Sequence, residues 1–142
     1  MQTNFKLYKN HAVQINDDIF DLHNDFAFLG FDYNVASRQL ILKWKKLDEQ
    51  WVRHEMPKTL DIILEHLEFL KIFPRDSEIQ FAEDDCLRDW TYYSSELRDS
   101  VEDNECVSPS EMPGPENDVI FKFESGLIIR AKGVGIFARV SC

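Results

Sequence analysis

The expected fold is decided by residues 119–140, which read VIFKF-ESG-LIIRA-KGVG-IFARV. Val119, Phe121 and Phe123 occupy every second position of the first run, and the second run repeats this spacing. A period of two residues is typical of a half-buried antiparallel strand pair. A third strand is predicted at 136–140. This stretch therefore predicts part of a β-sheet core.

The loop between the first two runs determines how these strands pair. A three-residue loop, Glu124-Ser125-Gly126, uses its glycine for the left-handed conformation at the turn. This loop places Phe121 opposite Ile129, whereas a two-residue loop would place Phe121 opposite Arg130. We therefore expect the three-residue loop.

A second hairpin is predicted at 26–46, where the apolar runs FAFLGFDY and RQLILKWKK flank the polar turn NVAS. Leu40, Leu42 and Trp44 share one face of the second run, with Lys43 and Lys45 on the other. Near its start, the first run has apolar residues at both odd and even positions, so both faces of the strand are apolar. This pattern predicts a central strand. Because Trp44 should point inward, the run KWKK is interpreted as an ordinary strand and not as a nucleic-acid-binding segment.

The segment 59–73 fits two structures. At a period of 3.6 residues its leucines and isoleucines form a helical stripe, with Thr59 as the N-cap. At a period of two residues it forms two short strands with a kink at Glu65-His66. Periodicity alone favours the helix, and Pro74 ends the element in either case.

The order of apolar segments resembles that of a set of small, uncharacterised bacterial β-rich proteins, some of which are regarded as toxin-immunity proteins. The resemblance runs from about residue 22 through LHND, FLGFDY, LILKWKK, LDIILEHLEFLKIFPRD, EDDCL and VIFKFESGLIIRA. In such proteins the middle segment is usually a strand pair, so the resemblance implies strands at 60–73. The resemblance implies no catalytic residues.

Together these features predict a single, mainly β domain over residues 1–142, with an α+β fold as the alternative. Antiparallel hairpins at 26–46, 60–73 and 119–140 are expected to form a curved sheet or open barrel. Short helices are expected near residues 17–23 and 83–90.

The charge is concentrated in one segment. The chain carries a net charge of −10, and residues 77–118 hold 13 of its 26 acidic and 2 of its 16 basic residues. We interpret this segment as an acidic, mobile excursion from the domain. Its charge disfavours binding to nucleic acid and anionic membranes and favours a basic protein partner or simple solubility. The candidate partner-binding residues are Glu83, Asp84, Asp85 and Asp89.

The sequence predicts a cytoplasmic location without a membrane anchor. Its N-terminus lacks the apolar run of a signal peptide, and no stretch approaches about 20 uninterrupted apolar residues. Three cysteines fit a reducing compartment better than a disulfide framework. A bridge between Cys86 and Cys106 across the acidic segment stays an open alternative.

No cofactor, metal or catalytic site is predicted. The four histidines lack the i, i+4 spacing of a helical zinc site, although a site assembled from His23, Asp25 and other residues stays open. Asp84 and Asp85 disfavour a reactive thiolate at Cys86. The motif GVGIFA at 133–138 matches a dinucleotide-loop pattern, but too few residues follow for the helix that it requires.

The sequence identifies no activity. The function that it favours is a non-catalytic binding protein, with a toxin-neutralising immunity protein as the more specific version and a basic partner for the acidic segment. The alternative is a small enzyme or ligand-binding domain with a pocket at the barrel mouth.

Overall fold

The computed structural model describes residues 1–98 and 111–142. These residues form twelve strands and two short 3₁₀ helices, and none of their helices is long and apolar enough to cross a membrane. The prediction of a mainly β fold is confirmed. The strands are β1 (Gln2–Thr3), β2 (Lys6–Tyr8), β3 (Ala12–Ile15), β4 (Asp18–Asp21), β5 (Phe26–Asn34), β6 (Gln39–Lys46), β7 (Thr59–Glu65), β8 (Phe69–Phe73), β9 (Leu87–Ser94), β10 (Asn117–Phe123), β11 (Ile128–Lys132) and β12 (Gly135–Ser141). The helices are η1 (Phe81–Asp85) and η2 (Ser95–Leu97).

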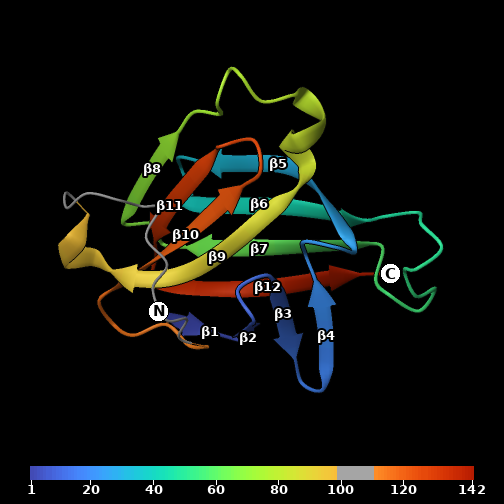
Figure 1. The fold of residues 1–142 in the computed structure, drawn as a ribbon. Coiled ribbons are helices and arrows are strands. Elements are labelled where there is room, and N and C mark those ends of the chain that lie inside the picture. The colour runs from blue at the N-terminus through green and yellow to red at the C-terminus, as the bar shows by residue number, and fades with distance from the viewer. Residues whose placement is uncertain (99–110) are drawn as a thin grey trace.

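The strands are arranged in three sheets. A five-stranded sheet has the order β1-β12-β7-β6-β5, a four-stranded sheet has the order β8-β11-β10-β9, and a small sheet has the order β2-β3-β4. Neighbouring strands are antiparallel except for β1 and β12, which are parallel. Figure 1 shows the four-stranded sheet lying obliquely across the five-stranded sheet.

Aromatic side chains join the two larger sheets. Phe28 of β5 contacts Phe123 of β10 with ring centroids 4.4 Å apart, and Trp44 of β6 lies 6.2 Å from Phe121. Contacts of this kind contribute about 0.5–1.5 kcal/mol each beyond the area that they bury. The core therefore lies between the sheets and includes residues from both.

The predicted hairpin of β10 and β11 is confirmed in its register. Phe121 lies opposite Ile129, and the loop glycine Gly126 has a φ of 88°. The third strand, β12, also forms, but it does not continue this sheet. It pairs with β7 and β1, because the turn at Gly133 carries the chain across the core into the five-stranded sheet.

The segment 59–73 forms strands, as the resemblance implied, and not the helix that periodicity favoured. Ile62 and Ile63 point to opposite faces of β7 and are both buried, and this burial of both faces produced the helix-like stripe. The prediction of a hairpin at 60–73 is wrong. β7 pairs with β6 and β12, whereas β8 pairs with β11 in the other sheet, and His66 occupies the intervening turn with a φ of 50°.

Strand β5 is an edge strand, so the prediction that it lies centrally is wrong. The register of β5 against β6 shifts between Phe28 and Gly30, which makes Leu29 an extra, bulged residue. Phe28 faces the core before the bulge, and Phe31 packs against the core after it. The β-bulge therefore explains the apolar residues Leu29 and Phe31, whereas Ala27, which lies before the bulge between Phe26 and Phe28, is itself buried.

The predicted helix at 17–23 is absent. Asn16 and Asp17 form a turn, with a φ of 54° at Asn16, and the chain returns as β4 against β3. The predicted helix at 83–90 is a short 3₁₀ turn, η1, followed directly by β9. Strand β9 lies inside the acidic segment and buries Trp90 and Tyr92. Residues 99–110 of the predicted acidic excursion lie outside the described residues, and so does Cys106.

A buried ion cluster fixes the end of the four-stranded sheet. The Asp118 carboxylate is fully buried and accepts hydrogen bonds from Arg130 Nε at 2.7 Å and Arg98 Nε at 2.8 Å. Burial acts to raise the pKa of Asp118, but the hydrogen bonds and charges of both arginines outweigh it, so that the pKa lies below 3.8. The carboxylate therefore remains charged through the neutral range.

The Asp118→Asn variant should lower the free energy of unfolding at pH 7 by about 3–5 kcal/mol, because two arginines lose their charged acceptor. Since folding lowers the pKa of Asp118, this contribution is present above pH 3.8 and is lost as the pH falls through the folded-state value. Urea unfolding at decreasing pH should therefore show the wild type converging with the variant. Asp32→Asn, which removes an exposed pair with Lys43, is the control and should cost less than about 1 kcal/mol. A loss at Asp118 no larger than the control's would contradict this role.

Candidate functional site

Strand β9 reaches the candidate site through a β-bulge. The register of β9 against β10 shifts between Lys122 and Phe123, and the extra residue on β9 is Arg88. This shift lets Leu87 and Trp90, three positions apart, both lie fully buried in the core. Arg88 stays exposed. The bulge thus determines how the chain leaves the sheet toward η1.

A cleft of about 560 Å³ lies between β5 and η1. Its walls come from the bulged part of β5, from η1 and from the loop between β10 and β11. Two apolar side chains at this cleft are exposed, Leu29 to 57% and Phe81 to 78%. Figure 1 shows η1 packed beside β5. The lining residues are Phe28, Leu29, Gly30, Phe31, Arg75, Phe81, Ala82, Asp84, Asp85, Ser125 and Leu127.

One cation, Arg75, and two carboxylates, Asp84 and Asp85, border the apolar surface. Arg75 Nε donates to Asp84 Oδ1 at 2.8 Å, and the Arg75 guanidinium lies 4.5 Å from the Phe81 ring centroid. Arg75 therefore compensates Asp84 and holds Phe81 in place. Asp85 forms no ion pair within residues 1–98 and 111–142, so the border of the cleft carries net negative charge, with Glu83 close by on η1.

Three of the four predicted partner-binding residues, Glu83, Asp84 and Asp85, lie together on η1. Asp89 lies farther along β9, opposite Lys122, and pairs with the exposed Arg88 at 3.1 Å. The apolar part of the cleft was not predicted, because Leu29 and Phe81 appear in sequence as ordinary core residues.

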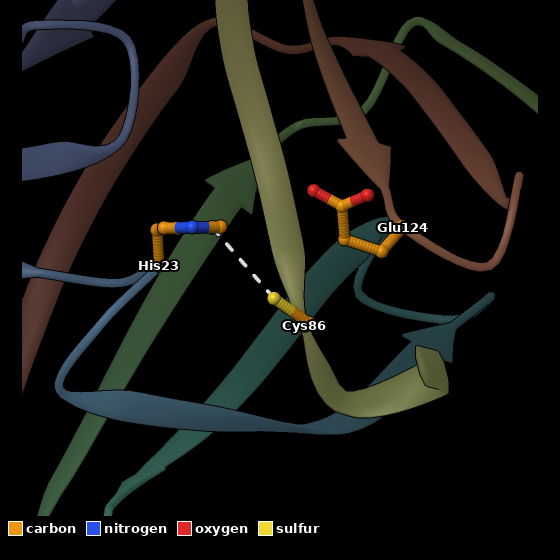
Figure 2. A group of neighbouring side chains, drawn as sticks. All are labelled: His23, Cys86 and Glu124. Atoms are coloured by element: carbon orange, nitrogen blue, oxygen red, sulfur yellow. Dashed lines mark hydrogen bonds between the residues drawn. The ribbon is translucent and has the colours of Figure 1, made fainter. Parts of the chain in front are cut away.

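A second group of side chains lies at the junction between η1 and β9. His23, Cys86 and Glu124 each offer one donor atom, and these three atoms lie within 4.8 Å of one another. Figure 2 shows the three side chains converging from three separate segments. The His23 Nδ1 atom lies 3.6 Å from Cys86 Sγ. All three residues are partly buried.

Backbone contacts position these three residues. The Glu124 N–H donates to the Cys86 carbonyl at 2.9 Å, which holds the two residues side by side. The His23 N–H donates to Asp21 Oδ1 at 2.9 Å, and His23 Nδ1 lies 2.5 Å from the Leu87 carbonyl oxygen. Burial acts to raise the pKa of Asp21, but hydrogen bonds from Asn24 and the charge of His11 lower it overall.

The thiol of Cys86 is not activated as a nucleophile. Burial first, and then the charges of Glu124, Glu83 and Asp85, raise the pKa of Cys86 to about 11. The prediction that acidic neighbours disfavour the thiolate is confirmed for Asp85. Cys86 is a free thiol.

His23 was expected to bind a metal only as an open alternative, together with Asp25, and the structure places Cys86 and Glu124 beside it instead. His23 and Cys86 are 63 residues apart, so no local spacing could reveal the group. Comparisons with protein-family models, with curated proteins and with solved structures found no match.

Alkylation of Cys86 by iodoacetamide at pH 8 in EDTA should be at least about tenfold slower than alkylation of the exposed Cys142, because the thiolate of Cys86 is scarce. Peptide mapping by mass spectrometry measures each rate. Glu124→Gln should accelerate the labelling of Cys86, whereas Glu65→Gln, at an exposed position on β7, should not. Equal rates at Cys86 and Cys142 would contradict the description of this thiol.

Proposed function

We propose that this chain is a non-catalytic binding protein whose cleft between β5 and η1 receives an apolar, basic segment of a partner protein. The observation that carries the proposal is the combination of exposed Leu29 and Phe81 with the carboxylates of η1 around one cleft. Large apolar side chains exposed within a polar rim are typical of interaction sites.

The edge of β5 supports a peptide-like occupant. Among the described strands β5 pairs only with β6, so its other edge has no strand partner, and its residues 28–31 line the cleft. An extended segment can add to such an edge through backbone hydrogen bonds while its side chains enter neighbouring pockets. Leu29 and Phe81 would then contact the apolar side chains of that segment.

The charge around the cleft supports a basic partner. Glu83 and Asp85 are exposed, and Arg75 already compensates Asp84. A positively charged segment would complete the charge balance and would be steered toward the cleft during association. The more specific proposal, a toxin-neutralising immunity protein, rests on the sequence resemblance and on this acidic character, with the toxin as the basic partner.

The alternative, an enzyme or small-ligand binder, has one supporting observation, since the cleft volume falls within the range of roughly 300–1,000 Å³ for ligand pockets. The side chains of the cleft are less suitable for catalysis or for binding a small ligand. The cation of the cleft is already paired with Asp84, and the neighbouring thiol of Cys86 is held protonated by burial and acidic neighbours. A binding role therefore accounts for more of the cleft.

Selection from a random peptide library displayed on phage tests the proposal. The enriched peptides should place lysine or arginine next to large apolar residues. Binding of a synthetic enriched peptide, measured by fluorescence anisotropy, should weaken at least about tenfold in Leu29→Ser and Phe81→Ser, a loss of about 1.4 kcal/mol. Val35→Ser, at an exposed apolar position in the β5–β6 turn, is the matched control and should bind normally.

The acidic residues should act mainly on the rate of association. Glu83→Gln with Asp85→Asn should slow association at low salt and reduce its salt dependence, because these charges are exposed. Asp17→Asn with Asp18→Asn removes the same charge from the exposed end of the β3–β4 hairpin and should have little effect. Enriched peptides without basic residues, or equal binding by the cleft variants, would overturn the proposal.

A further inference from the structure

We propose that His23, Cys86 and Glu124 form a binding site for one divalent transition-metal ion, with Zn²⁺ as the ion that fits best. The three donor atoms already lie within 4.8 Å of one another. In a tetrahedral zinc site, with Zn–S near 2.3 Å and Zn–N near 2.0–2.1 Å, neighbouring donors are roughly 3.3–3.7 Å apart. Small side-chain rotations therefore suffice to close the group around an ion.

The chemistry of the donors selects the class of ion. A thiolate, an imidazole and a carboxylate are the ligands that zinc takes in proteins. Calcium and magnesium prefer oxygen donors only, so this set disfavours them. Three protein ligands leave a fourth position for water, as in zinc sites with an open coordination position.

His23 faces Cys86 with its Nδ1 atom, which lies 3.6 Å from Sγ. The same atom lies 2.5 Å from the Leu87 carbonyl oxygen, and a bound ion would take the place of this contact. In a neutral imidazole that carries its proton on Nε2, the Nδ1 lone pair is available to a metal. The hydrogen bond from the His23 N–H to Asp21 Oδ1 at 2.9 Å holds the residue in position beside Cys86.

The other two ligands are held together before any ion binds. The Glu124 N–H bonds to the Cys86 carbonyl at 2.9 Å, at the point where the β9 bulge ends regular pairing with β10. Each ligand comes from a different segment, namely the β4–β5 turn, the η1–β9 junction and the β10–β11 loop. Because backbone hydrogen bonds fix these segments, little conformational freedom would be lost on binding.

Local charge also favours a cation. Glu83 and Asp85 lie on η1 directly before Cys86, and Glu124 is itself one of the three candidate ligands. A bound dication is attracted by these carboxylates, and a thiol that coordinates it is deprotonated by the metal.

Titration of the EDTA-treated and dialysed chain with Zn²⁺, in the presence of a metal-free reductant, tests the proposal by calorimetry. We expect one ion per chain with a Kd of about 1 μM or tighter. Co²⁺ should give the thiolate charge-transfer absorption and the intense visible bands of a tetrahedral site. Cys86→Ser should abolish the charge-transfer band, and Glu124→Gln should weaken binding by more than the roughly 10–100-fold typical of losing an outer-shell partner.

Matched variants keep the test specific. Cys142→Ser, Cys106→Ser and His54→Asn remove other candidate donors and should bind like the wild type. Circular dichroism of each variant reports whether it is folded, and Glu124→Gln, a near-isosteric change, decides the question if Cys86→Ser unfolds. Absence of binding, unchanged binding by folded Cys86→Ser, or equal competition by Mg²⁺ would overturn the proposal. None of these results depends on the peptide-binding cleft, since the only probe is the metal ion.

Discussion

Side chains of a strand alternate between its two faces, and the core residues of β9 do not obey a single alternation. Trp90 and Tyr92 face the core in one phase, whereas Leu87 belongs to the other phase, and all three are buried. The bulge at Arg88 reconciles them by inserting one residue between the two phases. The path of the chain before β9 depends on this irregularity, including η1, the cleft and the position of Cys86.

A second bulge, in β5, shifts the alternation of side chains in the five-stranded sheet. The extra residue Leu29 shifts the phase of β5, so that Phe28 and Phe31 both contribute to the core while Leu29 itself remains exposed. The ring contact between Phe28 and Phe123 then joins this strand to the end of β10. The two bulges therefore lie near each other across the core, and the cleft forms where regular pairing ends in both sheets. β-Bulges are frequent next to functional sites because they redirect side chains.

Local sequence patterns predicted where the strands lie better than which strands pair with one another. The register of β10 with β11 followed from alternation and from the need for glycine in the loop, both of which are encoded within a few residues. The separation of β7 from β8, and of β11 from β12, depends on which sheet buries each strand, and such long-range packing leaves no local signal. The helix expected at 17–23 failed for a related reason, since Asn16 is as suitable for a turn as for a helix cap. The acidic residues of η1 could be recognised from charge alone, but the convergence of His23, Cys86 and Glu124 required the fold.

The cleft between β5 and η1 is proposed to bind an apolar, basic segment of a partner. The most direct measurement is an NMR structure of the chain bound to a peptide obtained by selection, with intermolecular contacts assigned by isotope filtering. We expect contacts from apolar peptide side chains to Leu29, Phe31 and Phe81, with the peptide backbone paired along the outer edge of β5. Contacts confined to another face of the molecule, such as the β2-β3-β4 sheet, would contradict it.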